Sequence, residues 1–202
     1  MKVAIILNAP ELKEDVKEDY VVFADGAYKF KDKLKNKIVL GVVGDFDTLD
    51  HIPEEEKIVK LTPEKDFTDG ERAVYYAKES GADEIAIYGA TGGKPDHVLG
   101  NLTLLSVAES LGLKAEIAGE NCVIRLVSGL VEEQSEIGRT VSLIPFGGEA
   151  TVKYLYGLYY PLDKSNPLVL KCGNTLGLSN RATGKEFAFD VIKGEVLMIK
   201  YL

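Results

Sequence analysis

Several residue types are scarce in this chain of 202 residues, which has no tryptophan and only two cysteines, two histidines and two methionines. The cysteines, Cys122 and Cys172, lie far apart without CxxC spacing or a nearby histidine pattern, which argues against a zinc site. We expect both to be buried thiols in a reducing cytoplasm rather than a disulfide. No apolar run reaches the length of about 18 residues that a membrane helix needs, and no secretory leader pattern opens the chain.

Basic residues are also in deficit, with 24 Lys and Arg against 32 Asp and Glu, a formal net charge of −8. A nucleic-acid surface needs an excess of Lys and Arg, so we do not expect nucleic-acid binding. A polyanionic substrate would need a metal ion beside such an acidic protein. Hydrophobic residues at 46% and charged residues at 28% are typical of a globular protein with a substantial core.

The first part of the chain contains apolar runs of strand length, each ending in polar residues. These runs are Val3 to Leu7, Tyr20 to Ala24, Ile38 to Val43, Lys57 to Leu61, Glu84 to Tyr88 and Lys114 to Ala118. Helical patterns cover 28–35, 68–80 and 95–111, the last with a buried stripe of Val98, Leu99, Leu102 and Leu105. This alternation predicts an α/β domain over residues 1–120, with a Rossmann-like, mostly parallel sheet and helices.

The pattern changes after residue 120, where short apolar or alternating runs are separated by Gly, Asn and Ser turns. These runs are 123–127, 140–145, 150–154, 168–171, 186–191 and 195–201. They predict an antiparallel β-sandwich over residues 121–202. We expect the tyrosine cluster of this part to serve core and edge packing rather than a ligand platform; its members are Tyr154, Tyr156, Tyr159 and Tyr160.

Aspartates stand at the ends of two predicted strands. Asp25 follows one strand, and Asp45 and Asp47 follow the next. In an extended backbone, Asp45 and Asp47 would point to the same side with Cα atoms roughly 6.5 Å apart. That spacing suits one or two hard cations such as Mg²⁺ at the sheet edge where parallel sheets bind ligands. The alternative is an Asx-turn, in which the carboxylates accept hydrogen bonds from backbone amides.

A third acidic segment, Lys65-Asp66-Phe67-Thr68-Asp69, opens a predicted helix. Thr68 and Glu71 fit a capping box, and acidic residues in a first turn complement the helix dipole. A helix that starts directly after a strand end also lets a carboxylate reach a metal on the neighbouring strand. Both interpretations of Asp66 and Asp69 stay open.

The segment from Gly89 to His97 joins a predicted strand to a helix that starts near Pro95. Its glycines offer backbone N–H groups and a helix N-terminus to a phosphate, and Lys94, His97 and Asn101 share one helix face. The segment is neither a Walker A loop nor a GxGxxG fingerprint. A tight turn followed by a solvated helix face is the alternative.

Five motifs together resemble the thiamine pyrophosphokinase (thiamine diphosphokinase) family. They are Ala24-Asp25-Gly26-Ala27, Gly44-Asp45-Phe46-Asp47, Lys65 to Asp69 with Glu71, Gly89 to His97 with Asn101, and Gly177-Leu178-Ser179-Asn180. Each motif is weak alone. All five occur in family order, with an α/β half before a β half, and they span nearly the whole chain.

The resemblance implies transfer of the pyrophosphoryl group of ATP to the hydroxyethyl group of thiamine, which gives thiamine diphosphate and AMP. It also implies a cytoplasmic homodimer with an active site at the subunit interface. By motif, Asp45, Asp47 and Asp69 would bind Mg²⁺ and act in catalysis with Asp96, and Ser179 and Asn180 would bind thiamine. The implied ATP-binding residues are Asp25, Gly26, Thr68, Gly92, Gly93, Lys94 and His97.

Three other functions fit the same residues. A related pyrophosphokinase could act on a pterin alcohol with the same metal and ATP chemistry. A metal-dependent phosphohydrolase would release phosphate or pyrophosphate without an acceptor. A non-catalytic nucleotide sensor would bind ATP without turnover.

Overall fold

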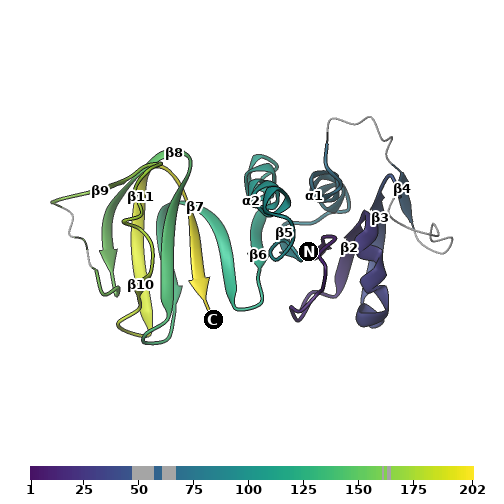
Figure 1. Ribbon diagram of the computed structural model, residues 1–202, viewed down its shortest axis with the longest axis horizontal. Helices are drawn as coiled ribbons and strands as arrows, with labels where there is room; N and C mark the ends of the chain where they lie inside the picture. The colour runs from purple at the N-terminus through teal and green to yellow at the C-terminus, as the bar shows by residue number, and fades with distance from the viewer. Residues whose placement is uncertain (47–56, 61–66, 161, 163–164) are drawn as a thin grey trace. The chain divides into compact units, whose positions relative to one another are not determined.

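The computed structural model describes residues 1–46, 57–60, 67–160, 162 and 165–202. It contains two compact units, Met1–Glu120 and Asn121–Leu202 (Figure 1). Within the described residues, no helix has both the length and the apolar character needed to cross a membrane.

The first unit is built on a parallel sheet. Its described strands are β1 (Lys2–Ile6), β2 (Tyr20–Ala24), β3 (Ile38–Gly44), β4 (Ile58–Lys60), β5 (Glu84–Tyr88) and β6 (Lys114–Ala118). Their order is β6-β5-β1-β2-β3-β4, and each neighbouring pair is parallel. Most residues of β1, β2 and β5 are buried, because packed layers cover both faces of such a sheet.

Helices lie on both faces of this sheet. The 3₁₀-helix η1 (Asp25–Leu34) contributes Ala27 and Phe30 to a cluster with Ala4 and Ile6. Side chains alternate along a strand, so the other face is left to α1 (Asp69–Glu79) and α2 (Pro95–Ser110), which lie side by side (Figure 1). The prediction that Leu99 belongs to the buried stripe of α2 is wrong, because Leu99 is 66% exposed. Its buried residues are Leu104, Leu105 and Ala108.

The second unit is antiparallel. Its described strands are β7 (Cys122–Gln134), β8 (Thr140–Tyr156), β9 (Leu168–Leu170), β10 (Asn180–Arg181) and β11 (Glu186–Tyr201). They are ordered β10-β8-β11-β7, with β9 also paired to β8.

The expectation that both cysteines are buried thiols is wrong, because Cys122 is half-buried and Cys172 is exposed.

The long strands of this unit bend at glycines. The sequence pattern divides 140–154 and 186–201 into two strands each, but each stretch lies in one strand, β8 or β11. Gly129 in β7, Gly147 in β8 and Gly194 in β11 have positive φ values of 69°, 69° and 68°. Glycine adopts this conformation without the steric cost that a Cβ atom brings, so these positions bend a strand without ending it.

The bend folds β7 back on itself. Arg125, near the start of this strand, forms an ion pair with Glu133 near its end, and Lys200 of β11 contacts the same carboxylate. Eight residues of straight strand would hold Arg125 and Glu133 about 26 Å apart. The two halves of the bent strands therefore face each other, with Phe187, Phe189 and Met198 in the core between them.

Candidate active site

Strand register brings residues from three segments to one edge of the first unit. Ile6 of β1 pairs with both Phe23 of β2 and Tyr88 of β5. Two residues further along these parallel strands, Asn8, Asp25 and Ala90 therefore lie at the same level beyond the strand ends. The carboxyl ends of parallel strands are where open α/β sheets bind ligands.

Asp25 organises the turn after β3. It is 4% exposed and has a φ of 44°, and its Oδ1 accepts a hydrogen bond from the Phe46 amide at 3.0 Å. A Cβ atom on Gly44 would lie 2.7 Å from the Asp25 Cβ, so only glycine allows this close approach. Asp25 thus makes a carboxylate-to-amide contact of the kind that the sequence offers as the alternative role of Asp45 and Asp47. Asp45 is half-buried beside it, and Asp47 lies outside the described residues.

Asp25 and Asp45 place carboxylates at the ends of neighbouring strands. Within the part of the chain that the structure describes, no group of three or more His, Cys, Asp or Glu residues is placed to hold a metal ion. Mg²⁺ is commonly held by one or two protein carboxylates, with waters and substrate phosphate oxygens completing its shell. The hard oxygen donors present here fit that kind of site.

The start of α1 lies close to the end of β1. A Cβ atom on Gly70 would be 3.3 Å from Leu7 Cδ2 and 3.2 Å from Leu104 Cδ1. Thr68 caps the helix, since its Oγ1 accepts a hydrogen bond from the Glu71 amide at 3.1 Å. This contact confirms the predicted capping role of Thr68. Asp69 is the half-buried first residue of α1, and Asp66 lies outside the described residues.

The segment between β5 and α2 begins buried, at Gly89 and Ala90, and is exposed to solvent from Gly92 onward. Gly92 has a φ of 91°, and the side chains around it are exposed; the exposed predicted residues are Gly92, Gly93, Lys94, Asp96 and His97. Asn101 of α2 donates a hydrogen bond from Nδ2 to the Ala90 carbonyl at 3.0 Å, which anchors the segment. Asp96 Oδ1 accepts a local hydrogen bond from the His97 amide at 3.0 Å. Backbone N–H groups beside a helix N-terminus form an environment suited to an anion.

In the second unit, the amide group of Asn180 is occupied by backbone contacts. Its Oδ1 accepts hydrogen bonds from the Tyr160 and Arg181 amides at 3.0 and 2.9 Å, and its Nδ2 donates to the Tyr160 carbonyl at 3.1 Å. Ser179 has a φ of 58°, and its amide donates to the buried Ser142 Oγ at 3.0 Å. Asn180 therefore shapes the surface around Tyr160.

That surface carries two aromatic residues whose role the sequence did not indicate. Tyr159 and Tyr160 are 65% and 66% exposed and lie edge to face with their ring centroids 5.0 Å apart. Tyr156 is 58% exposed. Core packing, one part of the expectation of core and edge packing, is therefore wrong for these three tyrosines, while Tyr154 is half-buried. Gly157, two residues before Tyr159, lies in a tight place: a Cβ atom added there would be 2.3 Å from the Glu186 carbonyl oxygen.

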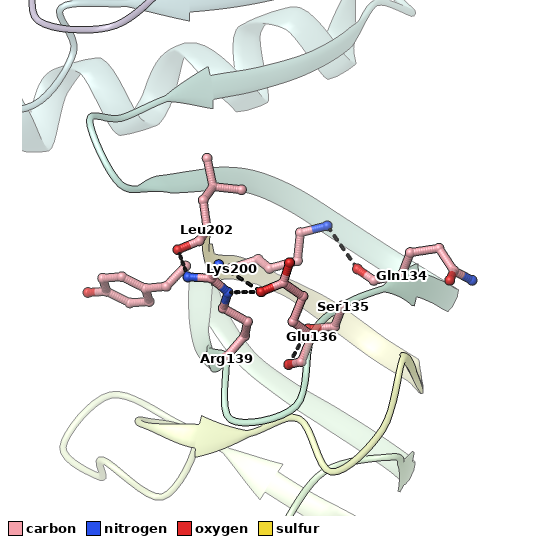
Figure 2. A pocket seen from close by; sticks show the side chains of 7 residues that line it. Gln134, Ser135, Glu136, Arg139, Lys200 and Leu202 are labelled. Atoms are coloured by element: carbon pink, nitrogen blue, oxygen red, sulfur yellow. Dashed lines mark hydrogen bonds and ion pairs between the residues drawn. The ribbon is translucent and has the colours of Figure 1, made fainter.

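A hollow of about 380 Å³ lies elsewhere in the second unit (Figure 2). Its cations already have partners: Arg139 contacts Glu136 and the Leu202 carbonyl, while Lys200 pairs with Glu133. Burial would raise the pKa of Glu133, but hydrogen bonds from Lys200 and Arg125 outweigh that effect and lower it. The cations that line this hollow are therefore already engaged within the second unit.

Two family models match consecutive parts of the chain. The thiamin pyrophosphokinase catalytic domain matches residues 13–117, and the thiamin pyrophosphokinase vitamin B1 binding domain matches residues 130–194. The chain is 33% identical over 166 residues to the thiamine pyrophosphokinase of Bacillus subtilis (strain 168), covering 78% of this chain and 76% of that protein.

Solved structures agree with this similarity. A crystal structure of thiamine pyrophosphokinase from Bacillus subtilis matches with a TM-score of 0.85 and 25% identity, covering 100% of this chain and 99% of that chain. One from Geobacillus thermodenitrificans matches with a TM-score of 0.81 and 26% identity, covering 100% and 98%. The mixed α/β fold with its extensive sheet is thus the fold of these enzymes. With both domain models matched in order and a relative above 30% identity, the chain belongs to the thiamin pyrophosphokinase family.

Proposed function

We propose that this chain transfers the pyrophosphoryl group of ATP to the hydroxyethyl group of thiamine, giving thiamine diphosphate and AMP. The observation that carries the proposal is the carboxyl edge of the first unit, where Asp25, Asp45 and the exposed glycine segment follow strands of one sheet in a chain of this family. Phosphoryl transfer depends mainly on positioning and on neutralising charge, and this edge offers both functions.

In this proposal, Asp45, Asp47 and Asp69 bind Mg²⁺, which when bound neutralises phosphate charge. Asp25 fixes the turn that presents Asp45. Gly26 and Thr68 border the triphosphate, and the exposed segment of Gly92, Gly93 and Lys94 binds it with Asp96 and His97 close by. The thiamine hydroxyl attacks the β-phosphorus, and AMP leaves.

We assign thiamine to the second unit. Ser179 and Asn180 shape its pocket, and the exposed rings of Tyr159 and Tyr160 offer aromatic faces to the cationic thiazolium, an arrangement suited to cation–π attraction. In this proposal, residues 1–120 form a domain with a Rossmann-like sheet that binds ATP and Mg²⁺. Residues 121–202 form a β-sandwich domain that binds thiamine, and the bent strands favour this description. The chain acts as a cytoplasmic homodimer in which the two units of one site come from different subunits.

The test is incubation with ATP, Mg²⁺ and either thiamine or a hydroxymethylpterin, with AMP, ADP, phosphate and pyrophosphate quantified. AMP formed in step with thiamine diphosphate supports the proposal. ADP as the nucleotide product would make the protein an ordinary kinase. AMP formed only with the pterin would indicate the sibling enzyme, and phosphate or pyrophosphate release without an acceptor would indicate a hydrolase.

A further inference from the structure

A polar pair outside the machinery described above lies at the same carboxyl edge. Lys29 of η1 donates a hydrogen bond from Nζ to Asn8 Oδ1 at 2.7 Å. Asn8 follows β1 by two residues and lies level with Asp25 and Ala90 by strand register. Both side chains of the pair are exposed.

The position of Asn8 is where the direction of strand order reverses. From β1 the chain builds β2, β3 and β4 on one side, and then returns to place β5 and β6 on the other side. Ligands of open α/β sheets bind in the crevice at such a point. Here the segments after β1 and β5 lie close together, because a Cβ atom on Gly89 would be only 2.8 Å from the Leu7 carbonyl oxygen. The Asn8–Lys29 pair therefore adjoins the open glycine segment.

The chemistry of the pair favours an anion. Asn8 is neutral, so it holds the Lys29 ammonium without cancelling its charge. Lys2 and Lys200, by contrast, are paired with carboxylates. The Lys29 ammonium also lies 4.9 Å from the Phe30 ring centroid, a second contact that restricts its position. A cation held in place in this way offers charge complementarity to a polyphosphate, and charge-assisted hydrogen bonds are stronger than neutral ones.

We propose that Lys29, positioned by Asn8, binds the triphosphate group of ATP; this inference rests on the proposed function and adds a phosphate-binding residue to it. Lys29 contributes the ammonium, and Asn8 is a positioning residue. The interaction is with phosphate oxygens, so inorganic tripolyphosphate should share it.

The test is calorimetric binding of Mg²⁺-tripolyphosphate to the full chain. Lys29→Met keeps the apolar stem over Phe30 but removes the charge, and we expect affinity to fall by about tenfold or more. Lys29→Arg should stay within about threefold of wild type, because it keeps the charge. Lys33→Met is the matched control: this lysine lies on the same helix, and its Nζ donates to the Leu12 carbonyl at 3.3 Å. The control should bind tripolyphosphate as wild type does. Among these three variants, only Lys29→Met should have a higher KM for ATP, and its KM for thiamine should not change.

Asn8→Asp separates phosphate binding from a merely structural tether. The substitution keeps an acceptor oxygen for Lys29 but adds a negative charge, so we expect weaker tripolyphosphate binding with an equal or higher melting temperature. A tether without a ligand role predicts unchanged affinity. Unchanged affinity in Lys29→Met, or no tripolyphosphate binding by wild type, overturns the inference. Wild-type binding without thiamine pyrophosphorylation would instead refute the proposed function and leave the Lys29 comparison valid.

Discussion

Neighbouring aspartates at the carboxyl edge have different surroundings, and those surroundings separate their roles. Asp25 is buried and its Oδ1 accepts a hydrogen bond from the Phe46 amide, so removing its carboxylate would disturb the turn after β3. Asp45 is half-buried at the end of β3. Substitution of Asp25 would therefore mix a structural effect with any loss of metal binding.

For Asp45→Asn we expect turnover to fall by about 100-fold or more, because the change removes an anionic oxygen ligand from the proposed Mg²⁺ site. A circular dichroism spectrum and a melting temperature, measured for the same variant, show whether the fold is kept. Asp32→Asn is the matched control, since the Asp32 side chain is 92% exposed and its contact is with Lys35 in the next turn. Wild-type turnover in Asp45→Asn would refute the metal site.

Substitutions of Asn180 and Tyr160 should differ most in their effect on stability. Asn180→Ala removes three hydrogen bonds to backbone groups, so unfolding should become easier by about 1–2 kcal/mol. Tyr160→Ala trims an exposed ring, so we expect little loss of stability but a roughly tenfold higher KM for thiamine. Denaturant melts and steady-state kinetics on both variants measure the contrast. An unchanged KM for thiamine in Tyr160→Ala would remove this ring from the thiamine site.

At the scale of elements, the glycines of the second unit that adopt positive φ differ in their surroundings. Gly194, at the bend of β11, has a φ of 68°, and a Cβ atom there would lie 2.3 Å from the Glu149 carbonyl oxygen. Gly138, in the turn before β8, has a φ of 86°, and a Cβ atom there would point into open space. The first glycine is required by both conformation and space, the second by conformation alone.

Gly194→Ala should therefore destabilise the protein more than Gly138→Ala does. Each change places an alanine in the left-handed backbone region, which lowers the free energy of unfolding by about 1 kcal/mol. At Gly194 the close contact with the Glu149 carbonyl oxygen lowers it by about 1–3 kcal/mol more. Urea titrations of both variants give the comparison. Equal losses would mean that the bend of β11 relaxes freely around a side chain.

The contact between the two ends of β7 predicts a pH dependence. Glu133 is 13% exposed, and its pKa is lowered by Lys200 and Arg125 against the effect of burial. A carboxyl whose folded-state pKa is depressed stabilises the protein above its usual pKa of 4.5, and that stabilisation is lost as pH falls through the lower, folded-state value. Glu133→Gln should lose about 1–2 kcal/mol at neutral pH and less at acid pH. Glu132→Gln is the control at the exposed neighbouring position, and its free energy of unfolding should follow that of wild type from pH 7 to pH 3. Parallel pH profiles for wild type, Glu133→Gln and Glu132→Gln would refute the role of Glu133.

At the scale of the whole molecule, the proposal of a shared site can be tested with mixed dimers. Asp45→Asn damages the metal part, and the double change Ser179→Ala with Tyr160→Ala damages the thiamine part. Activity is measured with thiamine well below its KM, where the second variant turns over slowly. If each site combines units from two subunits, a mixed dimer has one intact site, so random exchange should restore about a quarter of wild-type activity. A tag pull-down verifies exchange. Verified exchange without recovery would place each site within a single subunit.

Much of the first unit follows from local pattern. The apolar runs at 20–24, 84–88 and 114–118 coincide with β2, β5 and β6, because strands buried on both faces read as continuous apolar segments. The cap at Thr68 was equally predictable, since capping involves residues only three apart.

The remaining features depended on contacts between distant residues. Gly147 and Gly194 resemble turn residues in the sequence, and only pairing with neighbouring strands turns them into bends within β8 and β11. The contacts from Asn8 to Lys29 and from Asn180 to Tyr160 join residues 21 and 20 positions apart, which no local pattern reveals. The sequence alone determined the strands, the cap and the family motifs, because these depend on residues close along the chain. Tertiary structure decided which polar groups meet and which rings stay exposed, because both depend on how separate segments pack.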